Sequence, residues 1–217
     1  MIRYGRRHWV LATCLSTLAG YVDAVGFLES GGLFVSFMSG NSTRLAVGLV
    51  DGAQVAAAAF GVVGAFVAGV VAGALIGHRA QARRPQAVLA GVAVFLAFAA
   101  AAGPEWPVAG LALMAAAMGL ENGVFQRDGE VSIGVTYMTG TLVKFGQRLA
   151  GALTGGARLA WAPYLMLWVG LVCGAVVVAA THGVLKTGAL WVAAAAALAL
   201  AALATWTSPV GREAGAS

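Results

Sequence analysis

The stretch VAAAAFGVVGAFVAGVVAGALIG, residues 55–77, contains no charged side chain and is rich in alanine, glycine and valine. A helix of about 20 apolar residues is long enough to cross the roughly 30 Å hydrocarbon core of a bilayer. Comparable apolar stretches begin at Trp9, Ala87, Val108, Trp161 and Gly188. The sequence therefore predicts an all-α, polytopic membrane helix bundle.

Composition supports the same fold class. Of the 217 residues, 60% are hydrophobic and only 10% are charged, and the mean hydropathy is +0.87. Soluble domains carry about 25% charged residues, so this chain has too few charges to cover a water-soluble globule. The net charge is +5, but the basic residues flank apolar stretches and form no basic face. We therefore expect lipid around the protein, and no nucleic acid partner.

One segment of the sequence occurs twice. FVSFMSGN at residues 34–41 is followed, 100 residues later, by GVTYMTGT at residues 134–141. The basic residue that follows each copy also recurs, as Arg44 and Lys144. An apolar stretch with a late acidic residue precedes each copy, and a glycine-rich apolar stretch follows it. We interpret the two copies, called here the first and second motif, as parts of an internal repeat.

The number of membrane crossings depends on the motif segments, at about residues 33–50 and 131–153. If they cross, the protein has eight spans; if they are re-entrant or broken helices, it has six, and the two halves are inverted. The positive-inside rule favours six spans with both termini cytoplasmic, because the bases then cluster on one side. The cytoplasmic bases would be Arg3, Arg6, Arg7, Arg79, Arg83, Arg84, Arg127, Arg158 and Arg212, with Lys186 outside.

These choices predict a single integral membrane domain at residues 1–217. Its first repeat is about 1–103 and its second about 104–217, each with three crossing helices and one motif helix. Non-helical backbone at membrane depth is tolerated only when it is buried in protein or lines a wet cavity, so the motifs should lie at the centre. The glycines at 69, 73 and 77 predict close helix packing, and we also expect a homodimer.

Both motifs carry polar residues at helical spacing, which places hydroxyls, an amide and a cation on one helix face. A half-helix N-terminus would add free N–H donors, so the motifs could bind a small polar or anionic solute. Alternatively, the hydroxyls bond to their own helices and the glycines only permit close packing. The candidate binding residues are Ser36, Ser39, Gly40, Asn41, Arg44, Thr136, Thr139, Gly140, Thr141 and Lys144.

Two acidic residues, Asp23 and Glu121, lie inside apolar stretches. A carboxylate at membrane depth costs several kcal/mol unless it is paired or hydrated, so both are candidates for charge pairing or proton coupling. The nearby cations suggest that Asp23 pairs with Arg44 or Lys144 and Glu121 with the other, while Asn122 supplies a hydrogen bond. The alternative is a fixed salt bridge that locks each motif to its neighbour.

The function classes follow from what the sequence contains and lacks. No catalytic or metal-binding motif is recognisable, so we expect no enzyme, no catalytic residues, no metal and no cofactor. The first hypothesis is a transporter or channel for a small solute, with its site between the two motifs. The second is a non-transporting membrane scaffold or assembly protein, in which the motifs are structural. A water-accessible cavity that touches both motifs would favour the first.

The ordered motifs AGYVDAVGF (19–27), FVSFMSGN (34–41), GLEN (119–122) and TYMTGT (136–141) resemble the bacterial YoaK-like family. The resemblance covers essentially the whole chain. It implies a multi-pass protein of the bacterial inner membrane, in a family classed as a domain of unknown function, and it implies no substrate. Glu121 departs from the family's more usual Gly-Leu-Gln-Asn pattern, which makes Asp23 the stronger acidic candidate.

Overall fold

The computed structural model describes residues 5–127, 130–185 and 188–206, and these are almost entirely helical. A two-stranded antiparallel hairpin, β1 (Gln126–Arg127) with β2 (Glu130–Val131), interrupts the helices. The predicted all-α membrane bundle is confirmed. Its helices are α1 (Arg6–Ser30), α2 (Met38–Asp51), α3 (Ala53–Ala80), α4 (Arg84–Ala102), α5 (Pro107–Glu121), α6 (Met138–Leu153), α7 (Ala162–Leu185) and α8 (Gly188–Leu203).

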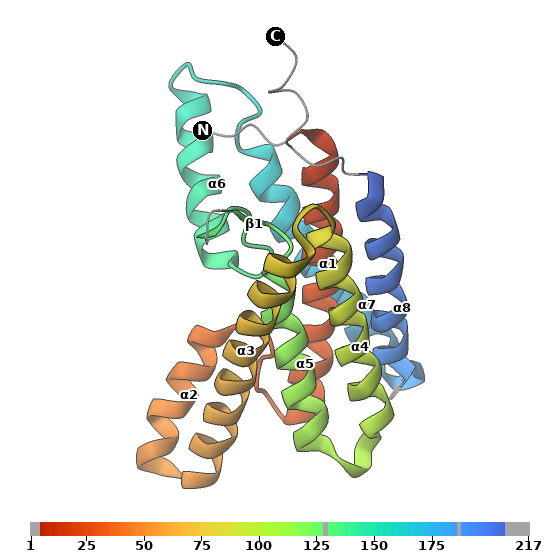
Figure 1. Cartoon of the computed structure of the whole chain (residues 1–217). Helices are drawn as coiled ribbons and strands as arrows, with labels where there is room; N and C mark the ends of the chain where they lie inside the picture. Colours follow the sequence, from red (N-terminus) through yellow and green to blue (C-terminus); the bar gives the residue numbers. More distant parts are fainter. Residues whose placement is uncertain (1–4, 128–129, 186–187, 207–217) are drawn as a thin grey trace.

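Three continuous helical segments are long and apolar enough to cross a membrane: Arg6–Ser30, Ala53–Glu105 and Ala162–Leu185. The second of these has 53 residues and contains both α3 and α4, which run in opposite directions on either side of a 3₁₀ turn (Figure 1). The apolar helices α5 and α8 are shorter, with 15 and 16 residues. All six apolar stretches recognised in the sequence therefore form helices.

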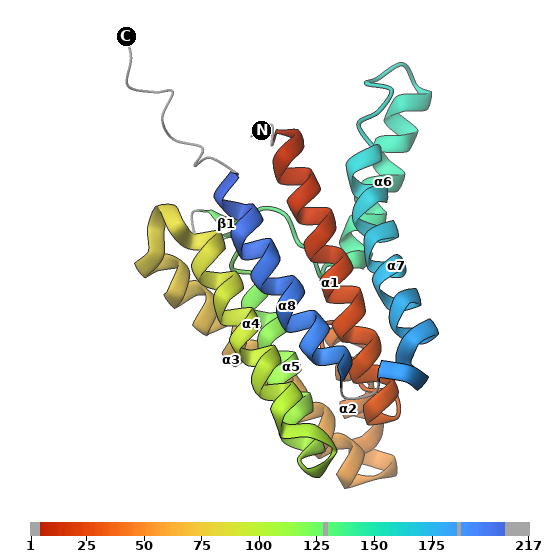
Figure 2. The same ribbon diagram turned by 90° about the vertical axis from the view of Figure 1, so that its right-hand side faces the viewer.

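The two motifs form short helices that begin inside the bundle. In Figure 1, α1 runs from the upper to the lower end, and the chain then returns to mid-height, where α2 begins and runs to the lower end. The second half runs the other way: α5 rises, and α6 begins near mid-height and runs to the upper end. Figure 2 shows α1 beginning and α8 ending at the same end of the bundle.

Glycines allow the long helices to pack backbone against backbone. A Cβ atom at Gly69 of α3 would collide with the carbonyl oxygen of Ala116 in α5, and one at Gly174 of α7 would collide with that of Thr17 in α1. The pair α1–α7 thus resembles the pair α5–α3. Such small-residue contacts are typical of membrane helices, and the close packing predicted for the glycine series is confirmed at Gly69.

Local sequence explains several helix ends. Gly31 follows α1 with φ of 69°, a left-handed conformation that glycine adopts without strain, and its N–H bonds to the carbonyl of Phe27. Proline lies in the first turn of both α4 and α5, where a missing N–H costs nothing. The central core is built from fully buried side chains of α1, α4 and α5: Leu11, Leu15, Leu89, Leu96, Met114 and Met118.

Candidate functional site

Two non-helical segments bring the motifs to the middle of the bundle. The first motif loop, residues 31–37, connects α1 to α2, and the second motif loop, residues 132–137, connects the β-hairpin to α6. Buried peptide groups need hydrogen-bond partners, because an unpaired buried N–H or C=O costs free energy. The side chains that satisfy the two loops therefore determine where α2 and α6 begin.

Asp23 of α1 holds the first motif loop. Its Oδ1 accepts hydrogen bonds from the backbone N–H groups of Val35 and Ser36, both at 2.8 Å. Val35 is fully buried and Ser36 nearly so. A carboxylate that accepts two amide hydrogen bonds makes a strong, charge-assisted contact. Asp23 is thus a structural anchor for the first motif.

Asn41 closes the same loop onto the first turn of α2. Its Oδ1 accepts from the N–H of Phe34 at 3.1 Å, and its Nδ2 donates to the carbonyl oxygen of Phe34 at 2.5 Å. The side chain is completely buried. Both polar atoms are therefore engaged by the loop, and the structure places this predicted binding residue in the wall of the site.

Asn122 contacts the second motif loop in the corresponding way. Its Oδ1 accepts from the Thr136 hydroxyl at 3.0 Å, while its Nδ2 donates to the carbonyl of Met118 at 2.9 Å. Ser16 of α1 adds a contact between the halves by donating to the carbonyl of Val135 at 2.9 Å. The side chains of Ser16, Asn122 and Thr136 are all buried, so these hydrogen bonds are shielded from solvent.

A cavity of about 240 Å³, called here the central cavity, lies where the two motifs meet. Among the described residues, Phe66 of α3 is the one lining residue from outside the motifs. Hydroxyl groups from both motifs reach the cavity, together with apolar and aromatic side chains. The lining residues are Ser36, Phe37, Met38, Ser39, Phe66, Thr136, Tyr137, Met138, Thr139 and Gly140.

Two helix N-termini meet at the central cavity. The residues that precede α2 and α6, Phe37 and Tyr137, provide no side-chain cap to the first-turn N–H groups. Among the described residues, the N–H groups of Ser39 and Thr139 have no acceptor. A helix N-terminus carries about half a positive charge, so the two ends together favour an electron-rich solute. No acidic side chain lines this cavity.

The predicted cations lie away from the central cavity. Arg44 packs its guanidinium against Gly32 and lines a different cavity with Asp51. Lys144 is exposed and does not line the central cavity. The predicted pairing of Asp23 with Arg44 or Lys144 is not formed, because the Asp23 carboxylate is used by the first loop.

Glu121 has a different environment from Asp23. It is completely buried at the end of α5, and neither of its carboxylate oxygens has a hydrogen-bond partner among the described residues. It forms no ion pair with Arg44 or Lys144. The neighbouring Asn122 is the residue that contacts the second loop. The structure therefore separates the two acidic residues that the sequence had grouped together.

The sequence-predicted residues divide into two groups. The structure brings Ser36, Ser39, Thr136, Thr139 and Gly140 together around the central cavity. Gly40, Asn41 and Thr141 lie beside it in the first turns of α2 and α6, without lining it. The apolar lining at 37, 38, 137 and 138 was missed, although these residues belong to the repeated motif and the repeat itself was a usable signal. Phe66 lies outside the repeated motifs, and nothing in the sequence indicated that it would line the cavity.

No group of three or more potential metal ligands occurs in the described part of the chain, and Cys14 and Cys173 are free thiols there. The polar lining of the central cavity consists of hydroxyls and backbone groups. Such groups suit hydrogen bonding to a small solute, because hydroxyls donate and accept while backbone amides donate.

Comparison with known proteins identifies the family. Residues 11–203 match the family described as "Protein of unknown function (DUF1275)". The chain therefore belongs to the DUF1275 family. This DUF1275 protein is 37% identical over 195 residues to a UPF0700 transmembrane protein of Rhizobium meliloti (strain 1021), an alignment that covers 89% of this chain and 84% of the relative. No solved structure matches. The relative and the long apolar helices together make the DUF1275 chain a multi-pass membrane protein.

Proposed function

We propose that this DUF1275 protein is a channel or transporter for a small polar or anionic solute, which binds in the central cavity. The observation that carries the proposal is that one cavity is lined by both motifs and faces the N-termini of both α2 and α6. Broken helices whose N-termini point at a substrate near the membrane midplane are a recurrent design of transport proteins. The cavity is lined by no acidic residue and admits only a small solute.

The proposal includes a topology. Helices α1, α3, α4, α5, α7 and α8 cross the membrane, while α2 and α6 begin near the middle of the bundle, each runs to one end, and neither motif segment crosses fully (Figure 1). The halves α1–α4 and α5–α8 form an inverted repeat, which is supported by the opposite directions of α2 and α6 (Figure 1) and by the resemblance of the α1–α7 and α5–α3 contacts. The end that carries Arg79, Arg83 and Arg84 is cytoplasmic. The membrane is the bacterial inner membrane, as the resemblance to the YoaK-like family implies.

The proposed topology explains why polar groups occur at this depth. Asp23 and Asn122 engage the side chains of Ser36 and Thr136, and Asn41 satisfies the backbone of the first loop. The hydroxyls of Ser39 and Thr139 and the first-turn amides remain available to a solute. In the scaffold hypothesis these groups would be buried in a dry, packed core. The open space between the motifs favours the transport hypothesis.

The test is flux through vesicles that contain the purified protein. Stopped-flow light scattering would measure the permeation of formate, nitrate, chloride, urea and glycerol, with empty vesicles as the baseline. Ser39→Leu and Thr139→Leu place apolar bulk in the central cavity. Ser42→Leu and Thr154→Leu are the matched controls, since both hydroxyls are exposed and bond only to their own helix or its end.

We expect the protein to accelerate at least one of these solutes, the cavity variants to return the rate to the baseline, and the controls to retain it. Equal rates in the cavity variants and the controls would refute a site between the motifs. Rates indistinguishable from those of empty vesicles for the whole panel would refute this proposal for the chosen solutes and favour the scaffold.

A further inference from the structure

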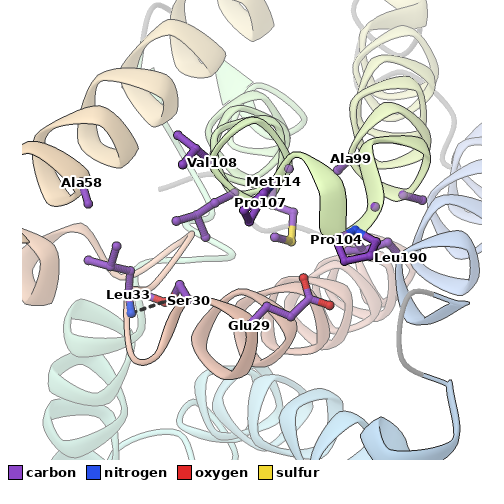
Figure 3. A pocket seen from close by; sticks show the side chains of 14 residues that line it. Glu29, Ser30, Leu33, Ala58, Ala99, Pro104, Pro107, Val108, Met114 and Leu190 are labelled. Atoms are coloured by element: carbon purple, nitrogen blue, oxygen red, sulfur yellow. Dashed lines mark hydrogen bonds between the residues drawn. The ribbon is translucent and has the colours of Figure 1, made fainter.

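A second cavity of about 550 Å³, larger than the central cavity, lies away from it, at the end of the bundle where α4 turns into α5. Figure 3 shows this cavity, called here the end cavity, between the end of α1 and the turn that contains Pro104 and Pro107. It shares no lining residue with the central cavity. It is lined by Glu29, Ser30, Leu33, Ala58, Pro107 and Met114, among others from α4, α5 and α8.

The lining of the end cavity is apolar except at one edge. Ser30 is a polar lining residue, but its hydroxyl accepts from the N–H of Leu33 at 2.8 Å and donates to the Leu33 carbonyl at 3.2 Å. Glu29 is the one ionisable residue that lines this cavity in the described part of the chain, and its side chain reaches toward Met114 and Pro104 (Figure 3). The cavity thus offers an apolar interior and a single carboxylate.

We propose that the end cavity binds an amphiphilic ammonium compound, with the ammonium paired to Glu29 and the alkyl chain against the apolar wall. The volume falls within the roughly 300–1,000 Å³ of known small-molecule sites, which are mostly apolar with a few polar groups that fix orientation. An N–H donor with a positive charge forms a strong hydrogen bond to a carboxylate. A negatively charged headgroup would be repelled at the same place.

One neighbouring group competes for Glu29. His182, at the end of α7, interacts electrostatically with this carboxylate. Removal of the His182 imidazole leaves Glu29 available to the ligand. His182→Gln should therefore bind the ammonium compound at least as tightly as the unmodified protein, which distinguishes a ligand site from a simple Glu29–His182 contact.

The experiment is photolabelling of the full chain in phosphatidylcholine nanodiscs. The probe is a decyl ammonium compound that carries a diazirine on its chain, and the comparison compounds are the corresponding alcohol and sulfate. Labelling of the peptide that contains Met114 is measured by mass spectrometry at increasing probe concentration. Glu29→Gln removes the charge and Ala58→Phe fills the cavity from α3. Their matched controls are Glu105→Gln and Ala101→Phe, exposed residues near the same end that do not line the cavity.

We expect saturable labelling by the ammonium probe. The apparent affinity should be about tenfold weaker in Glu29→Gln, the effect of losing a hydrogen bond to a charged group. Labelling should be abolished in Ala58→Phe. The controls should match the unmodified protein. Competition by added phosphatidylethanolamine would identify a membrane aminolipid as the source of the ammonium group, and its absence would indicate a free amphiphile. Equal labelling by the alcohol or sulfate compound, or unchanged labelling in Glu29→Gln, would overturn the proposal whatever the outcome of the flux experiment.

Discussion

Residues 31–37 and 132–137 both carry the chain back to the middle of the bundle, where α2 and α6 begin, but different groups hold them there. The first loop is bound by the Asp23 carboxylate through two backbone N–H groups and by the amide of Asn41. The second is bound by neutral groups, through the Asn122 amide and the Ser16 hydroxyl. The two copies therefore follow a similar backbone path, but different side chains stabilise it.

This comparison also explains why the loops should differ in strength. Asp23 accepts from two main-chain donors, so its loss leaves two peptide groups unsatisfied at membrane depth. Asn122 accepts from the side chain of Thr136, whose hydroxyl can rotate toward another acceptor. The first loop therefore depends on one residue more strongly than the second does.

The largest effect should come from Asp23→Ala. It leaves the N–H groups of Val35 and Ser36 without their acceptor, at roughly 1–3 kcal/mol for each buried donor, so the free energy of unfolding should fall by about 2–6 kcal/mol. Denaturation by SDS in mixed micelles measures it. Asp23→Asn keeps an acceptor oxygen and should lose less than half as much. Equal losses in the two variants would show that the charge, and not the hydrogen-bond geometry, holds the loop.

The next effect concerns the helix pairs that carry the loops. Gly69→Ala and Gly174→Ala would each place a methyl group against a backbone carbonyl of the facing helix, which cannot move without displacing that helix. Overpacking costs typically 1–3 kcal/mol, and a backbone clash should reach about 3 kcal/mol. Gly61→Ala and Gly183→Ala, with nothing within 4 Å on the same two helices, are the controls and should change the melting temperature little. Unequal losses at positions 69 and 174 would show that the two helix pairs are not equivalent.

A smaller loss is expected from Asn122→Ala. It removes the acceptor of the Thr136 hydroxyl, and we expect a loss of about 1–3 kcal/mol, clearly below that of Asp23→Ala. Unfolding in the same micelles provides the comparison. Asn122→Leu nearly preserves the side-chain volume while it removes both polar atoms, so it separates the lost hydrogen bonds from the lost volume. A loss as large as that of Asp23→Ala would contradict the proposed difference between the two loops.

Much of the fold could be predicted from the sequence because membrane helices have a simple physical signature. Six apolar stretches predicted six helices, and all six are present. The reduced hydropathy of the motif segments predicted that they differ from the rest, and they form α2 and α6, the helices that begin inside the bundle (Figure 1). The carboxylate positions were recognised because charge is rare in apolar stretches.

The roles of the polar residues could not be predicted in the same way. Helical spacing placed Arg44 and Lys144 on a face with Ser36 and Thr136, but both hydroxyl residues lie in loops before the helices begin. The spacing argument therefore failed, because helical periodicity does not apply to residues that precede the first turn of the helix. Nor could the spacing show that Asp23 accepts a hydrogen bond from a backbone N–H group 12 residues away. The sequence alone does not distinguish this carboxylate from other side-chain acceptors that could contact the loop. Phe66 enters the central cavity only through the packing of α3.

The smallest effect should come from Glu121→Gln, which contrasts the second acidic residue with the first. Both carboxylate oxygens of Glu121 lack partners among the described residues, so the substitution breaks no hydrogen bond and nearly preserves the shape of the side chain. The free energy of unfolding should change by less than about 1 kcal/mol, the size of one ordinary hydrogen bond. Solute flux should also be unchanged, because Glu121 does not line the central cavity. Glu121→Ala, which leaves a void in a fully buried site, is the destabilising control. Flux lost in Glu121→Gln with stability retained would instead give this carboxyl group a direct part in transport.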